Sequence, residues 1–282
     1  MNSPNINTKE MPTWCPGCFD FQILSGVRNF LAKKIRSESD KENWAIASGI
    51  GCASKIFDYV NLNGINALHG RVVPICLGMK IGNPNLNVLG FAGDGDAYAE
   101  GIEHLIHAAR YNSDFKYIVH NNQVFALTVG QPTPTTEKGY ADKTTPEGVK
   151  IEPLNPIKVM LAANCGFVAR VFADVKQVED VLAQAVKHKG FAFIEVIQPC
   201  IIFHPDVDYK KHAYNLQEAG HDKSNWKQAM DRALEFDYNK VEDKTKIPLG
   251  IFYEEEKETF EEKFSSLSEL RKKKIGWKDI KR

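Results

Sequence analysis

A Gly-Asp-Gly-Asp turn at 93–96 follows an apolar stretch, 86–92, that is typical of a buried strand. The next apolar stretch, 117–120, runs directly into a pair of asparagines that ends at Asn122, 28 residues after Asp94. In an open parallel sheet, ligands bind at the edge formed by the carboxyl ends of the strands. The pattern therefore predicts parallel strands with a polar site at their ends.

Strands and helices alternate through the first 200 residues. Further strands are expected at 44–48, 166–172 and 191–197, and helices at 21–31, 97–111, 156–164 and 175–189. Such alternation predicts the α/β class, with a doubly wound, mostly parallel sheet. Residues 131–153 are rich in Pro, Thr and Gly and predict a long loop, a feature that is usually functional in a compact domain.

The chain changes character after residue 200. A polar stretch with several aromatics is followed by an expected helix at 226–236 and by a densely charged segment at 254–274. We interpret residues 1–200 as the domain that carries the polar site and residues 201–282 as a C-terminal arm that wraps the domain or a partner subunit. For residues 254–282, a solvated tail with some helix is the alternative.

The balance of charge excludes some classes of partner. The chain has 36 basic and 36 acidic residues, so no global field attracts nucleic acid or an anionic membrane. It contains no run of 18 apolar residues, and residues 1–13 resemble neither a secretory signal nor a transit peptide. Six cysteines in a chain of this size and charge suit metal binding or catalysis in a reducing cytoplasm better than a disulfide framework.

The acidic turn and the asparagine provide the oxygen ligands that Mg²⁺ prefers. Asp94 offers a carboxylate, Asn122 a side-chain carbonyl, and Val124 a backbone carbonyl two residues later. The glycines allow the backbone to approach phosphate closely, and the helix expected from residue 97 offers its N-terminus to negative charge. A simple tight turn is the alternative, but the spacing to Asn122 favours a metal and diphosphate site.

Four cysteines are placed where they could bind a metal centre. Cys15 and Cys18 form a Cys-x-x-Cys pair, whereas Cys52 and Cys200 are isolated, 34 and 182 residues beyond Cys18. Zinc ribbons and fingers usually combine two close pairs, so scattered ligands beside a cofactor site suit a [4Fe–4S] cluster better, although zinc stays open. The other two cysteines, Cys76 and Cys165, have the surroundings of small buried hydrophobic residues.

The two constellations together resemble the β subunits of 2-oxoacid:ferredoxin oxidoreductases, which are thiamine-diphosphate-binding proteins. The Gly-Asp-Gly turn and the Asn-Asn pair match the thiamine diphosphate pattern, and the resemblance covers nearly the whole chain. The matching segments are Trp14-Cys15-Pro16-Gly17-Cys18, Gly49-Ile50-Gly51-Cys52, His69-Gly70-Arg71, Gly93-Asp94-Gly95-Asp96, Gly130-Gln131-Pro132-Thr133-Pro134-Thr135 and Pro199-Cys200.

The resemblance implies a set of site residues. Mg²⁺ is bound by Asp94, Asn122 and Val124; the diphosphate is contacted by Gly95 and Asp96; the thiamine lies beside Ile50, Gly51, Cys52, Ala53, His69, Ala126 and Leu127; and the [4Fe–4S] cluster is held by Cys15, Cys18, Cys52 and Cys200. Lys55 matches a position that faces the substrate carboxylate, unless it is an ordinary surface lysine. His104 and His107 are interpreted as structural.

The resemblance also implies an activity. The enzyme would oxidatively decarboxylate a 2-oxoacid, 2-oxoglutarate or pyruvate, to acyl-CoA and CO₂, using coenzyme A and passing electrons one at a time through the cluster to ferredoxin. The activating glutamate would come from an α subunit, so the chain alone would be inactive and would work as an αβ heterodimer or a dimer of such pairs. The sequence departs from many members at 125–130, where Phe125-Ala126 replaces Tyr-Gly and Val129 replaces a lysine, which bears on substrate preference.

Two alternatives stay open from the sequence. A non-redox thiamine diphosphate decarboxylase or carboligase subunit would explain the Mg²⁺ ligands but leave the four cysteines without a redox role. A non-enzymatic metal-binding or scaffold subunit would bind no thiamine diphosphate.

Overall fold

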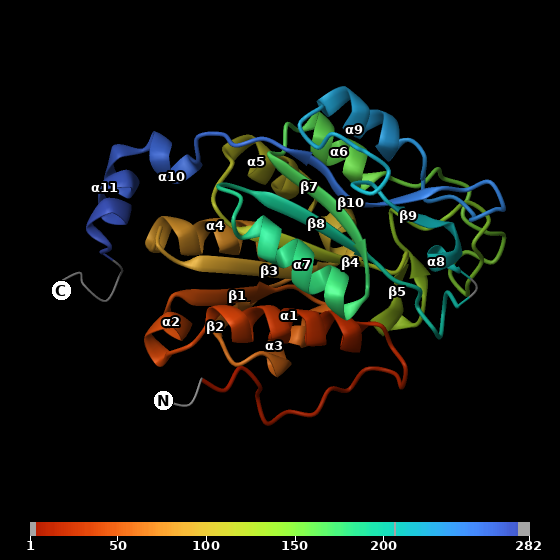
Figure 1. The fold of residues 1–282 in the computed structure, drawn as a ribbon. Helices are drawn as coiled ribbons and strands as arrows, with labels where there is room; N and C mark the ends of the chain where they lie inside the picture. The colour runs from red at the N-terminus through yellow and green to blue at the C-terminus, as the bar shows by residue number, and fades with distance from the viewer. Residues whose placement is uncertain (1–3, 206, 276–282) are drawn as a thin grey trace.

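The computed structural model describes residues 4–205 and 207–275 (Figure 1). Residues 1–3 of the predicted domain 1–200, and residues 206 and 276–282 of the predicted arm 201–282, lie outside the described part. The centre is an eight-stranded sheet of order β2-β1-β3-β4-β8-β7-β10-β9. Its strands are β1 Trp44–Ser48, β2 Asn63–Asn66, β3 Asn87–Gly93, β4 Lys116–Asn121, β7 Phe167–Phe172, β8 Ala192–Ile197, β9 Ala213–Asn215 and β10 Ile247–Glu254. A small second sheet pairs β5 Val124–Phe125 with β6 Gln131–Pro132.

The sheet is mostly parallel, as the sequence predicts. β1, β3, β4, β8 and β7 all run in the same direction, and β10 runs antiparallel to β7. β4, β7 and β8 are buried along their whole length, because helices cover both faces. The predicted α/β class with a doubly wound sheet is confirmed.

Helices form two layers around the sheet. α1 Asp20–Lys34 and α7 Val175–Ala185 lie in front in Figure 1, and their buried residues share one core with Ile46, Leu89 and Ile118 of the strands. The opposite face is covered by α4 Val72–Gly82, α5 Ile102–Tyr111, α6 Pro156–Ala162 and α9 Trp226–Ala233. Short helical segments complete the described chain: α2 Glu38–Glu42, α3 Ile56–Tyr59, α8 Tyr209–His212, α10 Phe260–Lys263, α11 Ser265–Lys273, η1 Ala53–Lys55, η2 Asp96–Glu100 and η3 Ala126–Thr128.

The prediction of one continuous helix at 97–111 is wrong. The chain forms a π-helical turn, η2, and then α5, with Gly101 between them. The Asp96 carboxylate accepts hydrogen bonds from the backbone N–H groups of Ile50 and Gly70, at 3.1 and 2.5 Å. These contacts hold the first turn against two neighbouring loops and account for its departure from regular α-helix.

The segment after residue 200 contributes to the sheet as well as to its surface. β10 pairs with β7, with Ile251 opposite Ala169, and β9 pairs with β10. The sequence did not predict either strand, nor the helix α4. The division of the chain at residue 200 stays a prediction.

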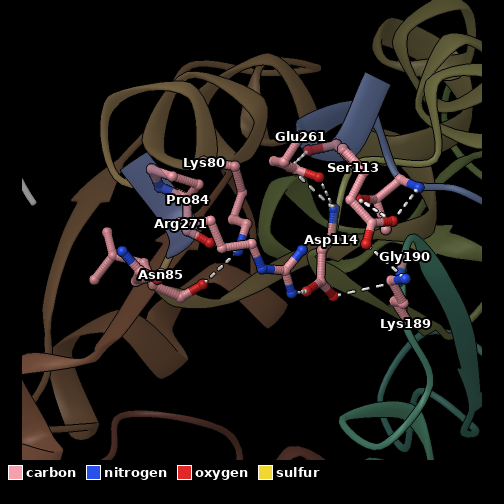
Figure 2. A network of polar contacts seen from close by, with 12 residues as sticks. Lys80, Pro84, Asn85, Ser113, Asp114, Lys189, Gly190, Glu261 and Arg271 are labelled. Atoms are coloured by element: carbon pink, nitrogen blue, oxygen red, sulfur yellow. Dashed lines mark hydrogen bonds and ion pairs between the residues drawn. The ribbon is translucent and has the colours of Figure 1, made fainter. Parts of the chain in front are cut away.

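The charged C-terminal helices are anchored by a polar network (Figure 2). The Glu261 carboxylate accepts hydrogen bonds from the Ser113 hydroxyl and from the Asp114 N–H, and Arg271 Nη2 lies 3.1 Å from Asp114 Oδ2. Glu261 is fully buried. The described part of this segment therefore docks on the domain as an arm, rather than lying as a solvated tail.

Among the described residues, no helix combines the length and the apolar character needed to cross a membrane.

Candidate active site

An open cavity of about 530 Å³ lies at the carboxyl ends of β1, β3 and β4. Every residue predicted to contact Mg²⁺ or thiamine diphosphate lines it: Ile50, Gly51, Cys52, Ala53, His69, Asp94, Gly95, Asp96, Asn122, Val124, Ala126 and Leu127. The structure thus brings together three loops that follow separate strands, as expected at this edge of a parallel sheet. The roles of the individual residues stay predictions.

Asp94 and Asn122 are suited to bind a divalent cation. Asp94 is buried, and burial raises the pKa of its carboxyl group to about 6 although Thr135 Oγ1 donates a hydrogen bond to Oδ2 at 3.0 Å. Asn122 Oδ1 accepts from Val124 N–H at 3.1 Å and has a second lone pair free for a metal. The described lining of the cavity includes two carboxylates and neither lysine nor arginine, so a bound cation would supply the missing positive charge.

The loop after β4 that carries Asn122 and Val124, called the metal loop below, is held in its conformation by Gln123. The sequence analysis did not identify Gln123. Its φ of 60° lies in the left-handed region, directly after Asn122. Its side-chain amide donates hydrogen bonds to the backbone carbonyls of Thr135 and Tyr238, and its carbonyl accepts from the Tyr209 hydroxyl. A polar residue directly after the asparagine pair is the only sequence signal for this role.

Asp96 organises the opposite side of the cavity. Its two carboxylate oxygens accept from the N–H groups of Ile50 and Gly70, and His69 Nδ1 lies 3.3 Å from Oδ1. A Cβ atom at Gly49 would lie 1.7 Å from Asp96 Oδ2, so only glycine fits there. Both oxygens accept hydrogen bonds from the chain, so Asp96 positions the loops around the cavity. Its contact with a diphosphate stays a prediction.

A second cavity, of about 780 Å³, is lined by all four candidate cluster ligands, Cys15, Cys18, Cys52 and Cys200. We call it the cysteine cavity, and the first one the cofactor cavity. These cysteines arrive from three places: the loop before α1, the end of β1 and the end of β8. The two cavities share a wall, because five residues line both of them: Cys52, Asn122, Ala126, Leu127 and Gln198.

Burial keeps two of these thiols protonated in the free protein. Burial, and then the neighbouring Asp20 carboxylate, raise the pKa of Cys18 well above its usual range and that of Cys52 to about 11. A metal centre binds the thiolate and releases the proton. These cysteines are therefore not suited to act as free nucleophiles, and a metal centre would have to displace their protons.

The four sulfur atoms are not gathered closely enough in this structure for a single tetrahedral zinc ion. Among the described residues, the one group of His, Cys, Asp and Glu whose ligand atoms all lie within 4.8 Å of one another is His69, Asp96 and Glu100, so no three of the sulfurs lie that close. At about 2.3 Å from each sulfur, one tetrahedral zinc ion would hold the sulfurs about 3.8 Å apart. In a [4Fe–4S] cluster each cysteine binds a different iron, which requires a wider spacing.

The remaining candidates lie as follows. Lys55 lines the cysteine cavity, with Nζ 3.4 Å from the Thr13 carbonyl oxygen. Cys76 and Cys165 are completely buried in the apolar core, as expected. His104 and His107 line a separate small cavity between α4 and α5.

Three residues in the shared wall region were missed by the sequence analysis. Asp20, His120 and Gln198 are almost completely buried, and Asp20 is hydrogen-bonded to both of the others. Each lies next to a motif that was recognised: Asp20 follows the Cys-x-x-Cys pair, His120 precedes the asparagines, and Gln198 precedes Pro199-Cys200.

Two family models match the chain. Residues 49–196 match the model described as thiamine pyrophosphate enzyme, C-terminal TPP binding domain. Residues 208–269 match the model that describes the C-terminal part of the pyruvate ferredoxin oxidoreductase beta subunit. The first match includes the acidic turn at 93–96 and the asparagine pair at 121–122, and the second includes β9, β10 and α10.

Curated proteins are similar over most of the chain. A 2-oxoacid:ferredoxin oxidoreductase subunit beta of Saccharolobus solfataricus is 35% identical over 92% of this chain and 87% of that protein. A 2-oxoglutarate oxidoreductase subunit KorB of Mycobacterium tuberculosis is 40% identical over 67% of this chain and 50% of that protein.

A solved structure is similar over nearly the whole length. It is a 2-oxoglutarate:ferredoxin oxidoreductase from Magnetococcus marinus with 2-oxoglutarate, coenzyme A and succinyl-CoA bound. The TM-score is 0.85 and the sequence identity 31%, covering 98% of this chain and 91% of that chain.

Proposed function

The chain belongs to the family of 2-oxoacid:ferredoxin oxidoreductase β subunits, and we propose that with an α subunit it catalyses the coenzyme A-dependent oxidative decarboxylation of a 2-oxoacid. The products are an acyl-CoA, CO₂ and two reduced ferredoxins. The substrate is 2-oxoglutarate or pyruvate. The relative named for 2-oxoglutarate and the similar structure that binds it support 2-oxoglutarate.

The observation that carries this proposal is the wall shared by the two cavities. Residues suited to Mg²⁺ and diphosphate line one cavity, four cysteines line the other, and Cys52 lines both. Decarboxylation without oxidation would need only the first cavity. Oxidation in single-electron steps needs an electron carrier beside it, and the second cavity is suited to hold one.

The residues of the chain divide the work as follows. Asp94, Asn122 and the Val124 carbonyl would bind Mg²⁺, and Gly95 would let the diphosphate approach the backbone. Cys15, Cys18, Cys52 and Cys200 would hold the [4Fe–4S] cluster that delivers electrons to ferredoxin. Thiamine diphosphate, when bound, supplies the carbanion chemistry at the 2-oxo carbon.

The site needs a second subunit. The described lining of the 530 Å³ cavity contains no glutamate that could activate the aminopyrimidine ring of thiamine. Lys55 is the only lysine or arginine among the described residues that line the two cavities, so the chain itself offers one cation to a substrate carboxylate. Both facts support an α subunit that completes the site.

Anaerobic assay of the co-purified αβ complex tests the proposal. We expect reduction of a viologen dye that requires both coenzyme A and a 2-oxoacid, and a broad absorbance at about 400 nm from the cluster. Cys200→Ser should abolish dye reduction and change the absorbance, whereas Cys165→Ala, a cysteine remote from both cavities, should leave the absorbance intact. Full activity of the β chain alone would refute the need for an α subunit to complete the site.

Measuring release of CO₂ without any electron acceptor separates this function from its rival. A complex that turns over the 2-oxoacid at the same rate without a dye or ferredoxin, and that has no cluster absorbance, would be a non-redox decarboxylase.

A further inference from the structure

Three polar side chains lie buried beside the wall that the two cavities share. Asp20 is the first residue of α1, His120 lies near the end of β4, and Gln198 directly follows β8. Their exposed fractions are 1%, 1% and 2%. His120 lines the cofactor cavity, Asp20 lines the cysteine cavity, and Gln198 lines both.

Asp20 fixes the orientation of the other two side chains. His120 Nδ1 lies 2.8 Å from Asp20 Oδ1, and Gln198 Nε2 donates to the same oxygen at 3.1 Å. Cys18 Sγ lies 3.6 Å from the other oxygen, Oδ2. Because a carboxylate only accepts hydrogen bonds, His120 must carry its hydrogen on Nδ1, and Gln198 must turn its NH₂ group toward Asp20.

This arrangement leaves two hydrogen-bond acceptors without partners. Once Nδ1 and the NH₂ group face Asp20, the neutral form of His120 keeps a lone pair on Nε2, and Gln198 keeps its carbonyl oxygen, Oε1. Both atoms are buried and lack a hydrogen-bond partner within the described chain. Buried polar atoms are nearly always paired, and an unpaired one is unfavourable. Two such atoms at one cavity therefore point to a ligand that carries a donor.

We propose that His120 and Gln198, oriented by Asp20, bind an N–H or S–H donor of a molecule held in the cofactor cavity. The inference rests on the proposed function, and it narrows the ligand by chemistry. A 2-oxoacid anion has a carboxylate and a ketone, which are acceptors only, so it cannot satisfy these atoms. The donors available to the enzyme are the amino group of the thiamine pyrimidine and the thiol or amide groups of coenzyme A.

Binding measurements on the αβ complex distinguish the two donors. His120→Phe keeps a ring of similar size but removes the acceptor. We expect it to weaken one ligand by about tenfold, seen as a higher Kd for thiamine diphosphate with Mg²⁺ in calorimetry or as a higher KM for coenzyme A. The KM for the 2-oxoacid should stay within about twofold. His188→Phe, which changes a buried histidine outside both cavities, is the matched control.

Asp20→Asn and Asp20→Ala together test the orienting role, the first with almost no change in volume. The asparagine oxygen can take the place of Oδ1 and still accept from His120 and Gln198, so this variant removes the charge and should leave the hydrogen of His120 on Nδ1. Asp20→Ala removes both acceptor oxygens, so the ring is no longer held. Nitrogen-15 NMR of histidine-labelled complex should show His120 protonated on Nδ1 in the wild type and in Asp20→Asn, and as a mixture of Nδ1 and Nε2 tautomers in Asp20→Ala. The resonance is assigned by its loss in His120→Phe.

The outcomes separate this inference from the proposed function. If the wild-type complex binds thiamine diphosphate and is active, but neither His120→Phe nor Asp20→Ala changes either ligand by more than about twofold, the wall has no role in binding and the inference is wrong. An Nε2 hydrogen on wild-type His120 would overturn it as well. A wild-type complex that binds no thiamine diphosphate would overturn the proposed function, and this inference with it.

Discussion

Replacing Arg170 by Met should destabilise the fold strongly, because it breaks a completely buried ion pair. Arg170 and Glu195 each have no exposed surface, and Arg170 Nε donates to Glu195 Oε2 at 2.8 Å. The guanidinium also lies 5.0 Å from the ring centre of Tyr238. The second Glu195 oxygen, Oε1, accepts from Asn121 Nδ2 at 2.8 Å, so the pair supports the asparagine that precedes the metal ligand.

The expected cost follows from what remains after the substitution. Arg170→Met fills most of the volume but leaves the Glu195 charge buried without a cation. Breaking such a pair costs about 3–5 kcal/mol, and we expect the lower half of this range because Asn121 and Tyr238 still donate to Glu195. In the double variant with Glu195→Gln, no charge is buried and the amide oxygen still accepts from Asn121. That variant should recover about 1–2 kcal/mol.

Urea denaturation of the four proteins of this cycle, followed by circular dichroism, measures the coupling. Arg232→Met is the control, since Arg232 pairs with Glu235 at a partly exposed site, where an ion pair contributes about 1 kcal/mol or less. Two results would contradict the reasoning: a double variant no more stable than Arg170→Met, or an Arg170→Met no more destabilised than the control.

Three further predictions concern other parts of the molecule. Asp94→Asn should reduce Mg²⁺-dependent binding of thiamine diphosphate by more than about tenfold in calorimetry, because it removes the charge that the cation needs; unchanged affinity would remove Asp94 from the metal site. Burial, and then the Lys116 charge, lower the pKa of His188 to about 4. As the pH falls below about 6.5, the usual pKa of histidine, the unfolded state is protonated at His188 before the folded state is, so the folded protein loses stability between about pH 6.5 and pH 4. His188→Phe should abolish that loss, about 2 kcal/mol at pH 5 in pH-dependent denaturation, and equal slopes in both proteins would contradict it. Glu261→Ala should release the C-terminal helices, and faster hydrogen exchange at 260–273 but not in β8 would show it; exchange unchanged at both places would mean that Glu261 does not hold them.

The part of the fold that positions the site could be predicted because each signal is local. The stretch 44–48 is apolar almost throughout, and it forms β1 with the same bounds. Strands that alternate with helices are forced to be parallel, and parallel strands place their carboxyl ends together. The convergence of Cys52, Asp94 and Asn122 therefore follows from three strand assignments, without any knowledge of the structure.

Other elements could not be predicted, because their own sequences argue against them. β10 contains Pro248 and Gly250, residues that are depleted in strands, and a charged segment follows it. Its place beside β7 depends on contacts more than 75 residues apart in the chain. The Asp20–His120–Gln198 group is hidden for a related reason: each residue alone is ordinary, and only folding brings positions 20, 120 and 198 into contact.

The metal loop depends on the segment that the sequence analysis treated as an arm. Gln123 adopts a left-handed conformation that is uncommon for its residue type, so tertiary contacts must hold it there. Two of those contacts come from the segment after residue 200, through the Tyr209 hydroxyl and the Tyr238 carbonyl. Because Asn122 directly precedes Gln123, a change that displaces either tyrosine also displaces the amide oxygen proposed to bind Mg²⁺. The C-terminal segment is thus a structural part of the candidate site, although it contributes none of the proposed ligands.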